Sequence, residues 1–178
     1  MRSLFIIFVL TLITVNLDAQ ALYSQGIIKG KSVNYYCKEL TRTVIVRNIQ
    51  NRDTLTDMYF DNEKTVPISW MLESGYNFKI GDIVQAFREV FTSQELKQLK
   101  NTRGSFIINV VADKAGNSLE MDFTFQKNNS VLSKFTLDRL FLLETKLKKI
   151  LKIKIRGEDV KIKNLKYMVV VSLDKDLN

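Results

Sequence analysis

The sequence contains no histidine. Histidine is the usual general base near neutral pH and the commonest metal ligand, so this absence excludes Ser-His-Asp and Cys-His catalytic sites and histidine-containing zinc sites. Carboxylate pairs, Ser-Lys sites and tyrosine-based sites remain chemically open, but none of their motifs can be recognised. We therefore expect a protein that is not an enzyme and that uses no cofactor.

Cysteine and proline each occur only once. A single cysteine cannot form an internal disulfide, so stability must come from packing. Cys37 follows two tyrosines and is most simply a small apolar core residue, the alternatives being a reactive thiol or an intermolecular bridge. With 46% hydrophobic and 26% charged residues, the 178-residue chain should fold as one domain, or as one domain with a smaller N-terminal addition.

The N-terminus has the organisation of a secretory signal peptide. A short positive segment, Met1 to Ser3, precedes an apolar run from Leu4 to Val15, and Ala19 and Ala21 supply small residues at cleavage spacing. An uncleaved anchor is the alternative, but the apolar run is shorter than the ~20 residues that span a bilayer. We expect residues 1–21 to be removed and the protein to be exported, to the periplasm or the outer surface.

The clearest structural unit is a β-hairpin within residues 104–126. Apolar residues alternate along 106–111, and along 119–126 Met121, Phe123 and Phe125 alternate with polar residues. The turn from Asp113 to Gly116 suits a loop that closes a hairpin. One face of this hairpin must be covered by the remaining chain, and the other, which carries Glu120 and Asp122, is predicted to be wet.

Helices are predicted on both sides of this hairpin. Asp82 is a plausible N-cap for a helix over 82–91, and Thr92 with Glu95 forms a capping box for a second helix. After the hairpin, Thr136 can cap the longest helix, whose apolar stripe extends to Leu151. Residues 165–173 form a last strand that is apolar on both faces, a pattern typical of a central strand.

The N-terminal extension, residues 22–79, is harder to organise. Residues 26–30 read as an exposed lead-in, and short strands are predicted in 33–37, 41–47 and 57–60. This extension could pack on the main domain as extra strands or lie against it as an ordered arm.

From Asp82 onward the order is helix, strand, strand, helix, strand, with the hairpin closed by the Asp113 to Gly116 turn. This order resembles the C-terminal domain of TonB and its relatives, and is similar to small exported Gram-negative domains of unknown function that share the fold. The resemblance implies an α+β domain over 80–178, with helices packed on an antiparallel sheet, and protein contact through a sheet edge.

The strongest electrostatic feature is a basic run in a chain of net charge +8. Its members are Lys146, Lys148, Lys149, Lys152, Lys154, Arg156, Lys161, Lys163 and Lys166. Such a run could bind an anionic glycan, lipopolysaccharide or lipid headgroups. Nucleic acid is not an expected partner, because no aromatic residue interleaves with the run. The alternative is a solvated helix face that continues into a lysine-guarded edge strand.

Two further groups of residues are candidate sites. Glu120 and Asp122 share one face of a strand and could act as an acid–base pair or bind calcium, although two carboxylates are too few for a closed calcium site. A group of aromatic residues could line a peptide or glycan groove or form a small core. It comprises Tyr35, Tyr36, Tyr59, Phe60 and Trp70.

These features together predict an exported, non-catalytic binding or scaffolding protein of the cell envelope. Its expected partner is another protein, contacted through a sheet edge. The alternative function is binding of an anionic envelope glycan or lipid through the basic run.

Overall fold

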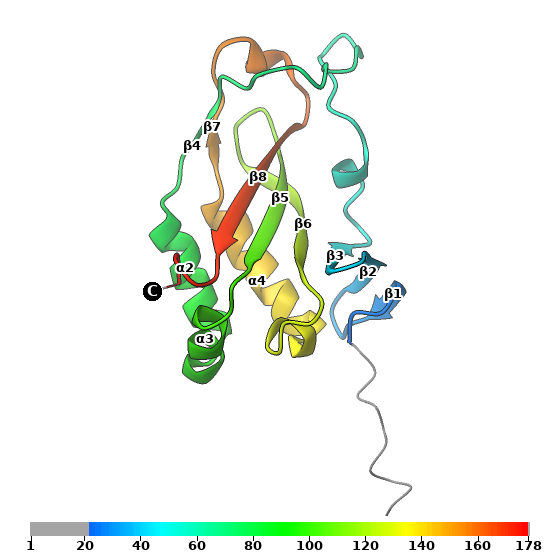
Figure 1. The fold of residues 1–178 in the computed structure, drawn as a ribbon. Coiled ribbons are helices and arrows are strands. Elements are labelled where there is room, and N and C mark those ends of the chain that lie inside the picture. Colours follow the sequence, from blue (N-terminus) through cyan, green and yellow to red (C-terminus); the bar gives the residue numbers. More distant parts are fainter. Residues whose placement is uncertain (1–21, 178) are drawn as a thin grey trace, which may run out of the picture.

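The computed structural model of the chain describes residues 22–177, and the predicted signal peptide lies outside them. A six-stranded antiparallel sheet has the order β1-β2-β3-β6-β5-β8 (Figure 1). The strands are β1 Gly26–Lys29, β2 Asn34–Glu39, β3 Thr43–Asn48, β5 Ser105–Ala112, β6 Ser118–Gln126 and β8 Leu165–Ser172. A separate two-stranded sheet pairs β4 Gly75–Tyr76 with β7 Ile153–Lys154.

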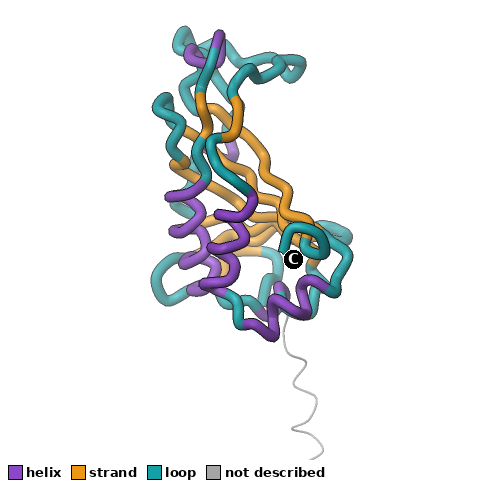
Figure 2. The backbone as a smooth tube through the Cα atoms, turned by 90° about the vertical axis from the view of Figure 1, so that its left-hand side faces the viewer, coloured by secondary structure: helices purple, strands orange, loops and turns teal. Residues whose placement is uncertain are grey.

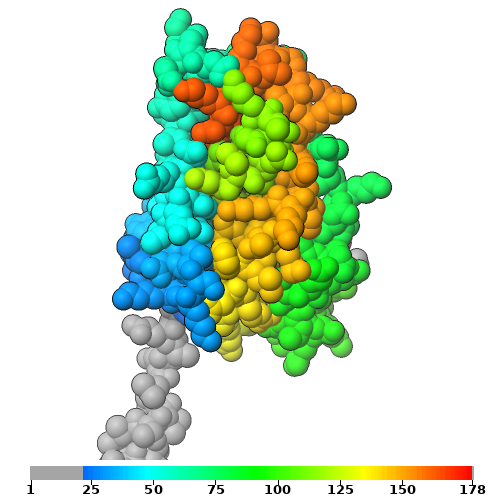
Figure 3. Space-filling model, turned by 180° about the vertical axis from the view of Figure 1, so that it is seen from behind, coloured from blue at the N-terminus to red at the C-terminus, as the bar shows by residue number. Residues whose placement is uncertain are grey.

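The helices cover one face of the large sheet (Figure 2). They are α2 Ile80–Val90, α3 Ser93–Lys100 and α4 Leu137–Ile150, with short 3-10 turns η1 Asp53–Leu55, η2 Leu132–Lys134 and η3 Gly157–Lys161. Seen from the helix side, α4 lies between the N-terminal strands and α2 (Figure 3). The predicted α+β class, an antiparallel sheet with helices packed on it, is confirmed. No helix within residues 22–177 is long and apolar enough to cross a bilayer.

The predicted hairpin is formed by β5 and β6 and lies in the interior of the sheet. Its helix-facing side chains, among them Phe106 and Phe123, are fully buried. In the turn, the Asp113 carboxylate accepts hydrogen bonds from the backbone N–H groups of Ala115 and Asn117 at 2.9 and 2.8 Å. Gly116 takes a φ of 81°, a left-handed conformation that glycine adopts without strain. The hairpin and its turn chemistry are therefore confirmed.

The N-terminal extension continues the same sheet rather than forming an arm. β3 pairs with β6, so that Val46 lies opposite Phe123. The expectation that residues 26–30 are an exposed lead-in is wrong, because β1 pairs with β2 across Gly26 to Lys29. Cys37 is fully buried, and burial raises the pKa of its thiol to about 12, so it is a core residue and not a reactive thiolate.

The last strand, β8, is at the edge of the sheet, so the expectation of a central strand is wrong. It pairs with β5, while the opposite side of the hairpin is taken by β3. Side chains on one face of β8 are buried under the helices, but Met168 and Val170 on the other face are 52% and 45% exposed. The apolar residues on one face of β8 are thus part of the core, whereas those on the other face are exposed on the surface.

The helix starts agree with the sequence in two of three cases. Thr92 and Glu95 form the predicted capping box, with Thr92 N–H donating to Glu95 Oε2 at 2.8 Å and Glu95 N–H to Thr92 Oγ1 at 3.2 Å. Thr136 is the N-cap residue of α4, although its hydroxyl makes no capping hydrogen bond. Asp82 is not the N-cap of α2: the helix begins at Ile80, and the Asp82 carboxylate accepts from the Lys79 N–H at 3.1 Å.

An ion pair between Glu95 and Arg139 joins α3 to α4, and it should make stability depend on pH. Arg139 donates to both carboxylate oxygens of Glu95, at 2.9 and 2.7 Å. These hydrogen bonds lower the pKa of Glu95 from 4.5 to about 2. A lowered folded-state pKa means that this stabilisation is fully present above pH 4.5 and is lost as the pH falls through about 2.

Glu95→Gln should therefore flatten the acid side of the stability profile. Urea unfolding of the parent and the variant at pH values across this range measures the effect as the difference between their free energies of unfolding. Glu158→Gln is a matched control, because its ion pair with Lys161 is on the exposed surface. An acid loss of stability as steep in Glu95→Gln as in the parent would contradict the assignment.

Candidate functional site

The outer edge of β8 is partly closed by other segments. The Lys166 N–H donates to Met58 Sδ at 3.3 Å, and the Met168 carbonyl accepts from the Tyr76 hydroxyl at 2.8 Å. At the far end of the strand, the Ser172 N–H donates to the Asp176 carboxylate at 2.7 Å. The three β8 residues in these contacts are separated by two and by four positions, as expected for backbone groups on the side of the strand that faces away from β5.

Val170 is the outward-facing residue between these contacts. By the same alternation, its backbone N–H and C=O both point away from β5. The Val170 N–H and C=O groups have no hydrogen-bond partner within residues 22–177. The side chains of Met168 and Val170 are both exposed. The β8 edge of the sheet is therefore open over a short window centred on Val170.

The face of the large sheet that turns away from the helices is called here the open face. One row of residues in register crosses all six strands on this face, and it mixes apolar and charged side chains. From β1 to β8 the row consists of Ile27, Tyr36, Arg47, Asp122, Asn109 and Met168. The Arg47 guanidinium lies 5.8 Å from the centre of the Tyr36 ring. The open face thus presents both hydrogen-bonding groups and apolar contact area.

Glu120 fastens the η1 turn over one end of the open face. Its carboxylate accepts hydrogen bonds from the backbone N–H groups of Arg52, Asp53 and Thr54, at 3.0, 2.7 and 3.1 Å. A carboxylate that accepts hydrogen bonds from three backbone N–H groups at the start of a turn has a structural role. Glu120 is therefore not a free member of an acid–base pair, although it remains partly exposed to solvent.

Asp122 is also not solvated as predicted, since it is only 8% exposed. The Asn109 side-chain amide donates to its Oδ1 at 2.6 Å, while its Oδ2 has no hydrogen-bond partner within residues 22–177. Burial raises the pKa of Asp122, although the Asn109 hydrogen bond and the charges of Arg47 and Lys166 oppose the rise. Within the same residues, no group of three or more His, Cys, Asp or Glu side chains is placed to hold a metal ion, so a calcium site has no support.

A cavity of about 340 Å³ lies on the open face between η1 and the β5–β8 pair. Its walls combine charged, polar and apolar groups. They are formed by Thr54, Asn109, Val110, Val111, Asp122, Lys166, Tyr167 and Met168. Sequence reasoning missed this site because its members come from four separate segments and share no motif.

Lys166 occupies one wall of this cavity. Its ammonium group donates to the carbonyl of Thr54 at 3.2 Å and to the carbonyl of Thr56. Burial lowers its pKa, and the nearby carboxylates, first Asp57 and then Asp122, oppose the change. The Thr54 hydroxyl oxygen is buried and has no hydrogen-bond partner in the described part of the chain.

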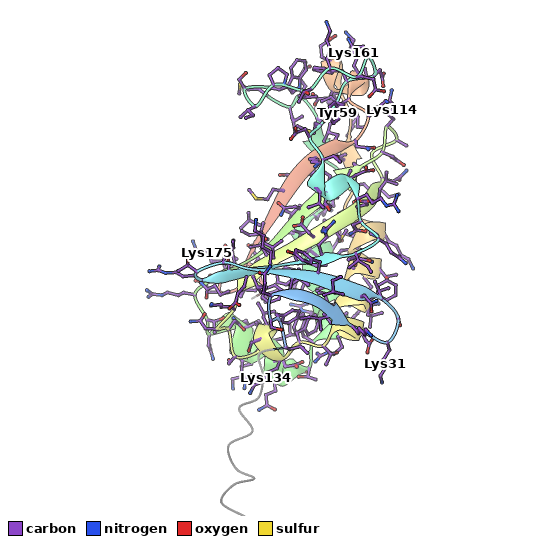
Figure 4. The ribbon with its side chains drawn as sticks, turned by 90° about the vertical axis from the view of Figure 1, so that its right-hand side faces the viewer. Lys31, Tyr59, Lys114, Lys134, Lys161 and Lys175 are labelled. Atoms are coloured by element: carbon purple, nitrogen blue, oxygen red, sulfur yellow. The ribbon has the colours of Figure 1, made fainter. Side chains whose placement is uncertain are left out.

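The nine residues of the basic run do not form one surface. Lys166 belongs to the cavity on the open face, whereas Lys146 pairs with Glu89 of α2 on the helix side. Three more are neutralised by ion pairs, namely Lys148 with Glu144, Lys161 with Glu158 and Lys163 with Glu63. The remaining exposed members, Lys149, Lys152, Lys154 and Arg156, form no ion pair within residues 22–177. Other lysines, such as Lys31 and Lys134, lie at the opposite end from Lys161 (Figure 4).

The five aromatic residues for which a small core or a groove was expected are divided between separate places. Tyr35 is buried under α4, where its hydroxyl donates to Glu144 at 2.8 Å. Tyr36 lies on the open face, and Tyr59 lies at the end of the molecule near Lys161 (Figure 4). Phe60 and Trp70 pack edge to face, with ring centres 5.1 Å apart. These five residues therefore do not line a common groove.

Asp159, in η3, is a buried carboxylate that the sequence did not indicate, and it binds the neighbouring 70–74 segment. Asp159 accepts hydrogen bonds from the Trp70 indole at 2.9 Å and from the Glu73 and Ser74 backbone N–H groups at 2.8 Å each. Burial alone would raise its pKa, but these hydrogen bonds outweigh burial and lower it. Every one of these contacts is internal, so the role of Asp159 is to fix the 70–74 segment against η3.

Comparison with known proteins adds information on the fold. No protein-family model matches the chain, and no curated protein matches it. The chain is similar to the crystal structure of a DUF5043 family protein from Bacteroides uniformis ATCC 8492, with a TM-score of 0.70 and 17% sequence identity. The match covers 88% of this chain and 90% of that chain, so it includes strands from the N-terminal extension. At this identity the similarity shows a shared fold alone, and it does not confirm the TonB-like topology.

Proposed function

We propose that this chain is an exported, non-catalytic binding protein of the cell envelope that accepts an extended segment of another polypeptide at the edge of β8. The supporting observation is the window at Val170, where outward-facing backbone groups without partners lie beside the exposed side chains of Met168 and Val170. Exposed strand edges pair readily with a further strand. The composition of residues 1–21 supports export, and the TonB-like order of elements over 80–178 supports an edge-binding mode.

The window admits only a short strand. The hydrogen bond from Tyr76 to Met168 bounds it on one side and that from Ser172 to Asp176 on the other. Tyr76 of the two-stranded sheet and Asp176, which follows β8, thus protect most of the strand from pairing with other chains, in the way that natural sheets block their edges. A bound peptide would gain specificity from side chains that contact Met168 and Val170 on the open face.

Panning a displayed library of random peptides against the mature chain tests this proposal. Val170→Pro removes the free N–H donor at a position where an edge strand tolerates proline. Binding of the selected peptides should weaken by at least about fivefold, the equivalent of one lost backbone hydrogen bond. Val170→Thr keeps both backbone groups and is the matched control. Far-ultraviolet circular dichroism should show that both variants keep the parent fold.

Two results would contradict edge pairing. The first is a set of selected peptides that bind Val170→Pro as well as they bind the parent. The second is binding that falls steeply as salt is added, because charge contacts are screened by salt and backbone pairing is not. The second result would favour the exposed part of the basic run as the contact surface.

A further inference from the structure

The cavity between η1 and the β5–β8 pair carries hydrogen-bonding groups that its own fold does not satisfy. Asp122 Oδ2 lacks a partner within residues 22–177, and the Thr54 hydroxyl is buried without one in the same range. A buried polar group without a partner costs free energy, typically about 1–3 kcal/mol. Within residues 22–177 the Thr54 hydroxyl is the one such atom at this cavity, whereas Asp122 Oδ2 is not fully buried and remains an acceptor that a bound molecule can reach.

The charges around the cavity argue against a charged occupant. An anion would have to approach the buried carboxylate of Asp122, and a cation would have to approach the ammonium of Lys166. Arg47 adds a second positive charge near Asp122, and Asp53, Asp57 and Glu120 surround Lys166. Like charges at close range in a partly desolvated site are costly, so opposite charges interleaved in this way favour a neutral ligand.

The groups that remain free are of mixed type. Asp122 accepts hydrogen bonds and Lys166 donates them. An alcohol hydroxyl both donates and accepts, so a ligand with several hydroxyls matches this mixture better than a ligand with only one kind of group. Val111 and the half-exposed Met168 supply apolar contacts for the carbon skeleton of such a ligand.

We propose that this cavity binds a single neutral, hydroxyl-rich sugar unit, with Asp122 and Lys166 as its main hydrogen-bonding residues. The volume of about 340 Å³ lies at the lower end of the range of small-molecule sites, roughly 300–1,000 Å³, which suits one sugar ring and not a longer chain. The cavity and the peptide window share Met168 of β8, but the proposal does not depend on strand pairing, because Asp122 and Lys166 belong to the cavity and the open backbone groups of Val170 belong to the window.

Methyl nuclear magnetic resonance of the mature chain with carbon-13 methionine provides a local readout. Met168 lines the cavity, while Met121 is fully buried on the helix side and Met71 is 87% exposed elsewhere. Added at millimolar concentrations, N-acetylglucosamine should shift the Met168 signal and leave the Met121 and Met71 signals unchanged. Glucosamine, which carries an ammonium group, and glucuronate, which carries a carboxylate, should bind at least about tenfold more weakly.

Two substitutions test the assigned residues. Asp122→Asn keeps the shape of the side chain, and Lys166→Met keeps its length without the charge. Each should weaken binding of N-acetylglucosamine by about tenfold, as expected when a hydrogen bond to a charged group is lost. Lys163→Met removes a lysine that is paired with Glu63 outside the cavity and should leave binding unchanged.

Three results would overturn the proposal. They are a Met168 signal that no neutral sugar shifts, tighter binding of a charged analogue than of N-acetylglucosamine, and full binding retained in both cavity variants. The first two are measured on the unmodified sequence, so they do not depend on whether a variant folds.

Discussion

Phe123→Asp is expected to leave the chain unfolded. Phe123 is fully buried in β6, opposite Val46 on one side and Ile108 on the other, and its ring centre lies 5.5 Å from that of Phe106. Aspartate would remove this aromatic contact area and place a carboxylate without a partner in the core. The combined cost should exceed about 5 kcal/mol, which is comparable to the whole stability of a typical domain.

Loss of near-ultraviolet circular dichroism and of the cooperative urea transition would be the expected result for Phe123→Asp. Thr124→Asp is a matched control, because the neighbouring residue in the same strand points to the open face and is partly exposed. This control should remain folded. A cooperative transition at the parental midpoint in Phe123→Asp would show that β6 does not present its odd-numbered residues to the core.

Gly116→Ala is expected to destabilise the protein by about 2–4 kcal/mol. Gly116 has a φ of 81°, and a Cβ atom there would lie well inside van der Waals distance of the Ile153 carbonyl oxygen. The Ile153 N–H donates to the Gly116 carbonyl at 3.0 Å, so the turn and the start of β7 are held together at this point. Alanine would force the two backbones apart and weaken both the hairpin turn and its contact with β7.

Gly81→Ala is the control for Gly116→Ala. Gly81 lies in the first turn of α2, and nothing lies within 4 Å of the position that its Cβ would occupy. Alanine should stabilise the protein there by about 0.4–1 kcal/mol, because it reduces the conformational freedom of the unfolded chain. Urea unfolding of the two variants should give changes of opposite sign, and equal changes would contradict the assigned conformation of the turn.

The two proposed binding modes share β8 but are distinguished by separate residues. Val170→Pro should affect peptide binding without altering the cavity, because its change is on the outer edge of the strand. Asp122→Asn should affect sugar binding without altering the edge. Failure of one proposal therefore leaves the other standing.

Features set by short stretches of sequence could be predicted well. The hairpin depends on alternation within β5 and β6 and on a turn of a few residues, and Asp113 and Gly116 carry that turn chemistry. The Thr92–Glu95 capping box depends on two residues at a spacing of three. In each case the interacting groups are close in sequence, so local pattern and local geometry coincide.

Features set by strand order and by which surfaces meet could not be predicted. The edge position of β8 follows from β3 pairing with the outer side of β6, a contact between residues 43–47 and 122–126. Asp122 is buried, and Glu120 binds the backbone of η1, because η1 crosses the open face. No pattern of residue spacing in the sequence indicates this arrangement. The cavity has the same origin, since Thr54, Asn109, Asp122 and Lys166 meet only when four segments are assembled.

By itself, the sequence determined that the protein lacks histidine chemistry and an internal disulfide, and that it contains a hairpin covered by amphipathic helices. These conclusions depend on residue identities and on periodicities of two and 3.6, which are local properties of the chain. The tertiary structure alone decided which strands lie at the edges of the sheet, which carboxylates are buried and which lysines remain unpaired. These three features depend on contacts between residues that are far apart in the sequence. Such contacts form only when the strands of the sheet are paired in their final register.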